Sequence, residues 1–411
     1  MWFNRITDSR FKVNKISVGF FTDFDELSRA DYAVVPYILT DCCEKYPDYK
    51  SLSMRFADLY GASVGDDTAF GGDRRYTSVS ISALDDRFAL NGESIERESC
   101  ELLCECIFRP LVSGGVFDGR LVRMMSSELI DAIDGVINDK RALAARNAAE
   151  SAFVGEARGL SIQGTHEQAE SITPESAYAA YRRMLKSGHV EIFAVGCSDF
   201  GDSEKCLADM FAAIERDSIC SLGVKPSVLK PQPLVVTDRM PMQQAIMRMY
   251  FKAPDMEDRY ANALMNMVLG GMTTSRFFEN IREKQSLCYY CSSAVDRPKC
   301  TLTVYAGVEP CNASRTRQAV LDEIEDVCEN GVSQDELERA KLEILNDVSS
   351  LYDSVGSIGS WYLGQVSDEE FISPEEYAER IKAVTAQRVR EVCRQYKPDT
   401  FYTLCPEEES I

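Results

Sequence analysis

The amino-acid sequence predicts an α+β protein built from two tandem homologous halves. Each half is expected to be a mostly antiparallel sheet with helices packed on one face, and the two halves together to form a clam-shell. Three observations lead to this fold class. The length of 411 residues exceeds one ordinary core, the sequence contains an internal repeat, and a proline-rich stretch separates the repeated parts.

The repeat is clearest between residues 15–39 and residues 245–269. Both segments read as an alternating strand, an acidic turn and an amphipathic helix. The apolar faces of the two predicted helices match position by position. These faces are Val34, Val35, Ile38 and Leu39 in the first half, and Leu264, Met265, Val268 and Leu269 in the second.

The later elements of the two halves also correspond. A second alternating strand is followed by helical stretches, a helix begun by proline and a final strand. Each half is therefore predicted to run β-α-β-α-α-α-β, and the third helix of the second half opens with a capping box at Ser333-x-x-Glu336. The matching segments are the strands at 77–83 and 302–306, the helices at 94–108 and 312–329, the helix starts at Pro174 and Pro374, and the strands at 190–195 and 400–404.

A polar stretch with four prolines separates the repeated parts, which is typical of an exposed linker. We expect an N-terminal half at residues 1–222, a linker at 223–241 and a C-terminal half at 242–411. A cleft between two such halves would be a favoured place for a ligand.

The composition excludes several classes of function. A net charge of −21 argues against nucleic-acid binding, which needs clustered basic residues, and could favour basic peptides. The sequence has no run of about 18 apolar residues, so no membrane insertion is expected. The N-terminus lacks a signal-peptide pattern, and fifteen cysteines spread through periodic segments suit free thiols, so we expect a cytoplasmic protein.

The cysteines show no spacing typical of a metal site. Cys288 and Cys291 form a CxxC in a predicted strand, where residues three apart point to opposite faces unless the strand bends. The pair Cys42-Cys43 and the pair Cys104-x-Cys106 lack a second ligand group at a suitable spacing, so packing roles are predicted for them.

Two histidines, His166 and His189, are the only ones in the chain, and both are predicted in exposed turns. No Gly-x-Ser-x-Gly elbow and no phosphate loop is present. Gly270-Gly271 is interpreted as the end of a helix.

The most informative segment is LGGMTTSRFFENIREKQSLCYY, at residues 269–290. It resembles the C-terminal-half motif of the pitrilysin/insulinase-type peptidases, relatives of mitochondrial processing peptidase. The tandem α+β halves match the layout of that family over nearly the whole chain.

The zinc site of that family is an inverted His-x-x-Glu-His motif on the first helix of the N-terminal half, with a further Glu downstream. Its place in this sequence is Ala33-Val34-Val35-Pro36-Tyr37, so both histidines and the first Glu are absent. The resemblance assigns the downstream Glu to Glu128. Because one carboxylate cannot hold zinc with useful affinity, neither zinc nor another cofactor is expected, and the chain is predicted to be inactive alone.

The substrate-binding residues of the family have counterparts in the second half. The resemblance assigns an Arg and a Tyr that bind the substrate backbone to Arg282 and Tyr289. Arginine offers paired donors to peptide carbonyls, and tyrosine offers a hydroxyl to a developing oxyanion. The alternative is a surface Arg–Glu pair and a tyrosine that packs in the sheet.

Two functions follow from the resemblance. The first is the non-catalytic, substrate-binding subunit of a two-chain zinc metallopeptidase, forming a heterodimer with a zinc-containing paralogue and acting on extended or unfolded peptides. The second is a peptide-binding or scaffold protein that keeps the fold without hydrolysis and adds the peptide as a strand at a sheet edge. A third, catalysis at a rearranged metal site, would need cysteine ligands from distant segments.

Overall fold

The structure is a computed structural model that describes residues 1–223, 225–368 and 370–407. The chain forms two compact units, each drawn from both halves of the sequence. Unit 1 comprises Met1–Gly135, Ser161–Gly223 and Leu351–Phe371, and unit 2 comprises Val136–Leu160, Val224–Ser350 and Ile372–Ile411.

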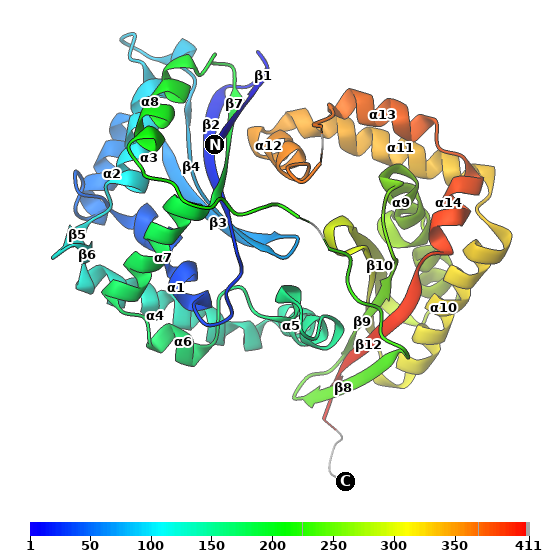
Figure 1. The fold of residues 1–411 in the computed structure, drawn as a ribbon. Coiled ribbons are helices and arrows are strands. Elements are labelled where there is room, and N and C mark those ends of the chain that lie inside the picture. Colours follow the sequence, from blue (N-terminus) through cyan, green and yellow to red (C-terminus); the bar gives the residue numbers. More distant parts are fainter. Residues whose placement is uncertain (224, 369, 408–411) are drawn as a thin grey trace. The chain divides into compact units, whose positions relative to one another are not determined.

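Unit 1 is a five-stranded sheet with the order β1-β7-β2-β4-β3 (Figure 1). Its edge strand β1 runs parallel to β7, and its other pairs are antiparallel. The strands are β1 (Trp2–Thr7), β2 (Val13–Thr22), β3 (Ser63–Gly71), β4 (Arg74–Leu84) and β7 (His189–Gly196), with a small hairpin of β5 (Val112–Ser113) and β6 (Val116–Phe117). The helices are α1 (Arg29–Asp41), α2 (Tyr49–Asp58), α3 (Ile95–Phe108), α4 (Gly119–Gly135), α6 (His166–Glu170), α7 (Pro174–Ser187), α8 (Gly201–Ala212) and α12 (Val355–Leu363).

Unit 2 repeats this topology, with the order β8-β12-β9-β11-β10. Its edge strand β8 also runs parallel to its neighbour, β12. The strands are β8 (Leu234–Met240), β9 (Ala245–Lys252), β10 (Cys288–Asp296), β11 (Thr301–Val308) and β12 (Lys397–Pro406). The helices are α5 (Lys140–Ala152), α9 (Arg259–Asn266), α10 (Ala313–Asn330), α11 (Gln334–Ser350), α13 (Pro374–Lys382) and α14 (Ala386–Cys393), with π-helices η4 (Met267–Gly271) and η5 (Phe277–Lys284).

The predicted fold class of two homologous, mostly antiparallel halves is confirmed. The strand alternation in β4 shows why helices gather on one face of the sheet. Val79, Ile81 and Ala83 are buried in the helical core, whereas the serines between them face the opposite side. The predicted helix starts are also confirmed, because Thr173, Ser373 and Ser333 each cap a helix through the side chain.

Each unit also has a helix on the second face of its sheet, and this helix comes from the other half of the sequence. In unit 1, Ile358 of α12 packs with Phe193 and Val195 of β7. In unit 2, Leu143 and Ala144 of α5 belong to a cluster on the second face of the β9 and β12 pair. The sequence repeat therefore matches the strand order of the two units. Each unit, however, also contains one helical segment that belongs to the other half of the sequence.

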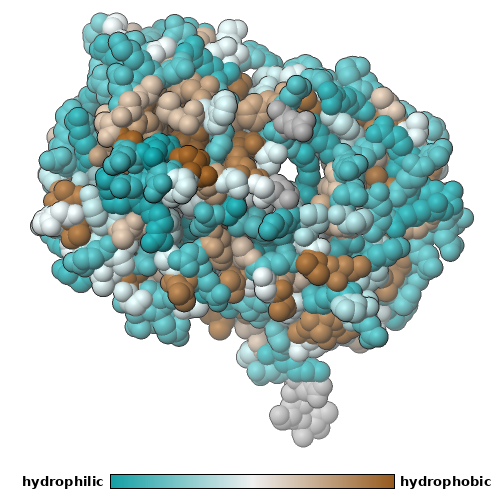
Figure 2. Space-filling model, viewed as in Figure 1, coloured by the Kyte–Doolittle hydropathy of each residue, from teal (hydrophilic) through white to brown (hydrophobic). Residues whose placement is uncertain are grey.

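Three strands of the two five-stranded sheets are absent from the sequence-based prediction. Strand β1 is a short edge strand, and β3 is mostly polar and exposed, so neither shows strong alternation. Strand β8 lies inside the stretch that was expected to be a linker, and it pairs in parallel with β12. Hydrophilic residues cover much of the visible face of the molecule (Figure 2). Among the described residues, no helix is long and apolar enough to cross a membrane.

Candidate functional site

The positions that correspond to the zinc motif lie on α1. Ala33 and Pro36 are buried in the helical core of unit 1, and Pro36 lies inside the helix. The carbonyl of Pro36 accepts a hydrogen bond from the Thr40 hydroxyl at 2.9 Å. Neither Ala33 nor Pro36 has a side-chain atom that can bind a metal, so packing is the role that the structure gives them.

The structure brings Tyr37 and Glu128 into the same neighbourhood, because α1 packs against α4. Burial raises the pKa of Tyr37, and the negative charges of Asp66 and Glu128 raise it further. A phenol held in its neutral form is a poor donor for zinc, and the single exposed carboxylate of Glu128 is too few ligands to hold the ion. The residues at the family's zinc position therefore do not fit the ion.

A hollow of about 300 Å³ lies on the second face of the unit 1 sheet. Strand β4 contributes alternate serines to it, and β3 forms one side of it as the edge strand. Helix α12 contributes Gly356, Gly359 and Ser360. The lining therefore combines small polar side chains with larger apolar ones such as Phe193 and Leu363. Its single cation, Lys15, lies opposite Ser82, whereas the acidic Asp67 lies opposite Ser78 at the other end of the serine row.

Register places particular β3 residues on the hollow side. Ser63, Gly65 and Asp67 lie opposite Ser82, Ser80 and Ser78 of β4, and residues that are directly opposite each other share a face. The intervening residues of β3 face α1. Strand β3 thus lies between the hollow, on one face of the sheet, and the degenerate zinc-motif positions of α1, on the other face.

Arg282 and Tyr289 lie in unit 2, on η5 and β10. The Arg282 side chain is 40% exposed, lies 3.6 Å from Glu283 and has its guanidinium 4.6 Å from the centre of the Phe278 ring. Tyr289 is 47% exposed, and its hydroxyl donates to Glu309, which raises the pKa of Tyr289. Within the described part of the chain, Arg282 and Tyr289 share no hydrogen bond or ring contact, and each has a local acidic partner.

The glycines of this segment have a steric role. A Cβ on Gly270 would lie 2.6 Å from the Phe277 ring and 2.7 Å from the backbone nitrogen of Ser293. Gly270 therefore allows η4 to pack closely on η5 and β10. Helix η4 ends at Gly271, as the interpretation of Gly270-Gly271 as a helix end predicts. The reason for glycine at position 270 is different: the neighbouring atoms leave no room for a side chain.

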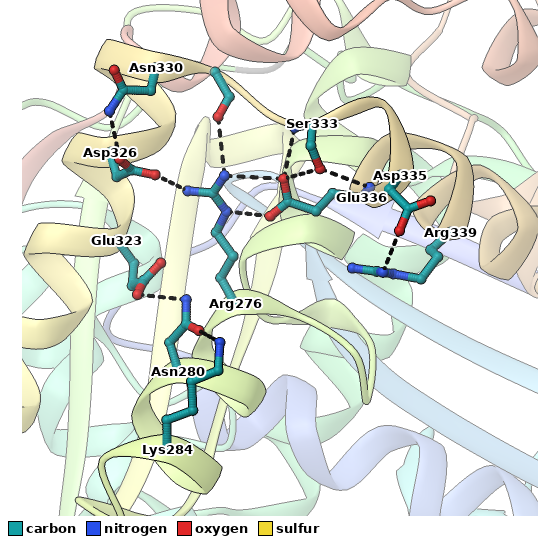
Figure 3. A network of polar contacts seen from close by, with 11 residues as sticks. Arg276, Asn280, Lys284, Glu323, Asp326, Asn330, Ser333, Asp335, Glu336 and Arg339 are labelled. Atoms are coloured by element: carbon teal, nitrogen blue, oxygen red, sulfur yellow. Dashed lines mark hydrogen bonds and ion pairs between the residues drawn. The ribbon is translucent and has the colours of Figure 1, made fainter.

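The same segment contributes a polar network that the sequence did not predict (Figure 3). The Arg276 guanidinium bonds both oxygens of Glu336, at 2.7 and 3.2 Å, and also pairs with Asp326. Glu336 is the acidic residue of the predicted capping box, and it accepts hydrogen bonds from the backbone and the hydroxyl of Ser333. All three nitrogens of the Arg276 guanidinium have partners, which indicates that this side chain fixes the start of α11 against η5.

The predictions for the cysteines need correction. A register shift between Cys288 and Tyr290 bends β10, so the thiols of Cys288 and Cys291 can hydrogen-bond. Cys104 also has partners: its Sγ lies 3.5 Å from that of Cys206, and these two thiols form a compact group with Cys100. The partner lies about 100 residues away in the sequence, so no local spacing could reveal it.

The structure places both histidines in regular elements rather than in turns, and only His166 is as exposed as predicted. His166 is exposed at the first turn of α6, and its Nδ1 lies 2.9 Å from Asp134. His189 instead begins strand β7, where it is half-buried and its Nε2 lies 2.7 Å from Glu191. The preceding Gly188 ends α7 and leads directly into the strand, so the turn is shorter than expected.

Comparison with known proteins finds one matching family description and relatives that are named as proteases. Residues 171–344 match the family described as "Peptidase M16 inactive domain". A "Probable inactive metalloprotease YmfF" of Bacillus subtilis is 22% identical over 375 residues, which cover 90% of this chain and 88% of that protein. An "Uncharacterized zinc protease SCO5738" of Streptomyces coelicolor is 25% identical over 79% of this chain and 75% of its own length.

Solved structures share the fold. A conserved protein from Enterococcus faecalis superposes with a TM-score of 0.88 at 23% identity, covering 100% of this chain and 97% of the other. A peptidase M16 inactive domain from Pseudomonas fluorescens has a TM-score of 0.79 at 17% identity, covering 99% and 95% of the two chains. These likenesses support the shared fold.

Proposed function

We propose that this chain, a member of the pitrilysin/insulinase-type (M16) peptidase family that lacks the zinc motif, is a non-catalytic subunit that binds extended peptides for a zinc-containing paralogue. The observation that carries the proposal is the β3 edge beside the serine-lined hollow. Strand β3 pairs with β4 on one side and is the last strand of its sheet. An extended peptide can add to such an edge through its backbone.

The hollow gives a reason for tolerance of different peptides. Side chains of an added strand alternate, so every second one would point toward the side lined by Ser78, Ser80 and Ser82. Small hydroxyl side chains offer hydrogen bonds without demanding one shape. Asp67 on the same face would favour a basic side chain, in keeping with the net charge of −21.

The peptide-binding part is tested with the isolated chain. Fluorescence anisotropy of a labelled, extended basic peptide should show saturable binding. Ser80→Phe should weaken binding by about tenfold or more, because the ring would fill the hollow. The matched control is Ser314→Phe on the exposed side of α10. Equal affinities of the wild type and Ser80→Phe would rule out this site.

The subunit part needs a paralogue with an intact His-x-x-Glu-His motif. Peptide hydrolysis should rise when this chain is added to the paralogue, and Arg282→Ala should reduce the gain. Arg120→Ala, an exposed arginine in unit 1, serves as the control. If the paralogue is equally active with and without this chain, the subunit role is wrong.

The second candidate, a peptide-binding scaffold, rests on the same β3 edge, because strand addition needs no metal. It would be favoured by peptide binding that Arg282→Ala leaves unchanged and that has no effect on the paralogue. The two candidates therefore differ in the response of the paralogue rather than in the binding of the peptide.

A further inference from the structure

Three cysteine thiols converge between two helices of unit 1, away from the β3 edge. Cys100 and Cys104 lie one turn apart on α3, so their side chains share a face of that helix. Cys206 faces them from α8, which packs against α3. The sulfur atoms of the three residues all lie within 4.8 Å of one another.

The spacing of these sulfurs is close to that of a metal site with three thiolates. With Zn–S bonds of about 2.3 Å, three sulfurs around one ion in a plane lie about 4 Å apart. The Cys104 and Cys206 sulfurs are 3.5 Å apart. Small changes in side-chain torsion would therefore bring all three thiols to one ion, with no movement of the helices required.

The three thiols of the cluster differ in burial and in pKa. Cys100 and Cys104 are 0% and 4% exposed, while Cys206 is half-buried and leaves a path for an ion. The hydrogen bonds that the other two thiols donate lower the pKa of Cys206, whereas those bonds and burial raise the pKa of Cys104. An arriving cation would displace the thiol protons as the sulfurs bind it.

Other thiols of the chain make a useful contrast. Cys328 and Cys393 have their sulfurs 3.5 Å apart, but among the described residues only the group on α3 and α8 joins three metal-binding side chains. The nearest turn of α3 carries Glu96, whose carboxylate accepts a hydrogen bond from Ser203. The cluster is therefore a purely sulfur donor set.

We propose that Cys100, Cys104 and Cys206 bind one thiophilic metal ion, of the class of Zn²⁺ or Cu⁺, as three thiolates. Soft thiolate ligands select these ions over hard cations such as Mg²⁺. With Zn²⁺ the fourth position would be open to water on the side of Cys206, whereas Cu⁺ would be satisfied by three sulfurs. The bound ion would tie α3 to α8, so its role is structural and separate from peptide binding.

The test uses reduced full-length protein that has been treated with a chelator and titrated with Cd²⁺. Thiolate-to-cadmium charge-transfer absorption should rise to an end point of one ion per chain, and Zn²⁺ should compete for the same site. Cys206→Ser should weaken binding by more than the ~10–100-fold that loss of an outer hydrogen-bond partner costs. Cys328→Ser, which removes a thiol from the two-sulfur pair, should leave the titration unchanged.

A second measurement guards against a variant that fails to fold. In the wild-type protein, bound Cd²⁺ should protect Cys100, Cys104 and Cys206 from alkylation, as mapped by peptide mass spectrometry. A parallel titration with Cu⁺ under reducing conditions ranks the two ions. The proposal is wrong if the wild type shows no charge-transfer band, or if protection falls on other cysteines.

Discussion

Asp399 is the buried acidic centre of unit 2, and its replacement by asparagine should strongly destabilise that unit. Its side chain is 0% exposed and accepts hydrogen bonds from the Lys230 backbone at 2.9 Å, from Lys230 Nζ at 3.0 Å and from the Thr400 hydroxyl at 2.7 Å. Lys252 Nζ lies 3.2 Å away and is also buried. Asp399→Asn keeps the shape but leaves two lysines without this counter-charge.

The magnitude follows from what each lysine retains. Breaking a buried ion pair by removing one partner costs about 3–5 kcal/mol. Lys252 Nζ still donates to the carbonyls of Ala152 and Val228, at 2.7 and 2.8 Å. The loss is therefore mainly that of the counter-charge, and we expect a fall of about 3 kcal/mol in the free energy of unfolding, at the lower end of that range.

Urea unfolding followed by far-ultraviolet circular dichroism measures this change. The control is Asp347→Asn, an exposed position on α11 in the same unit, which should change stability by less than about 0.5 kcal/mol. The double variant Asp399→Asn/Lys252→Met should be more stable than the sum of the single losses, because it removes both charges. If Asp399→Asn unfolds at the same urea concentration as the wild type, the account of the buried ion pair is refuted.

Three further changes test other parts of the structure. Ile358→Ala, at a fully buried position of α12, should cost about 2–4 kcal/mol in unit 1, which tryptophan fluorescence can report; an unchanged midpoint would contradict the packing of α12 on the sheet. Gly270→Ala should destabilise unit 2, since its Cβ would lie 2.6 Å from the Phe277 ring, and normal stability by circular dichroism would show that the π-helical segment adapts. Burial acts to raise the pKa of Glu336, but hydrogen bonds from Arg276 and Ser333 lower it from 4.5 to about 2. The stability from this pair is therefore present above pH 4.5 and lost as the pH falls toward 2, and Arg276→Ala should remove that part of the pH dependence in acid unfolding curves.

The relation between sequence and structure is clearest in the repeat. Alternation of apolar residues, proline at helix starts and capping residues are local patterns, and they predicted the main strands and the helix starts of both halves. The edge strands β1, β3 and β8 escaped prediction because an edge strand buries little and needs no strong alternation. The loss of the zinc ligands could also be read from the sequence, since Ala33 and Pro36 have no ligand atoms in any fold.

Tertiary structure alone decided which distant segments meet. The sequence analysis assigned no range to α5 or α12, and no local pattern indicates that each covers the sheet of the unit built mainly from the other half. Cys104 has no ligand at local spacing, and only the packing of α8 on α3 supplies Cys206. The physical reason is that the hydrophobic effect is non-directional. The spacing of apolar residues in the sequence therefore indicates that one face of a helix or strand is buried, but not which segment buries it.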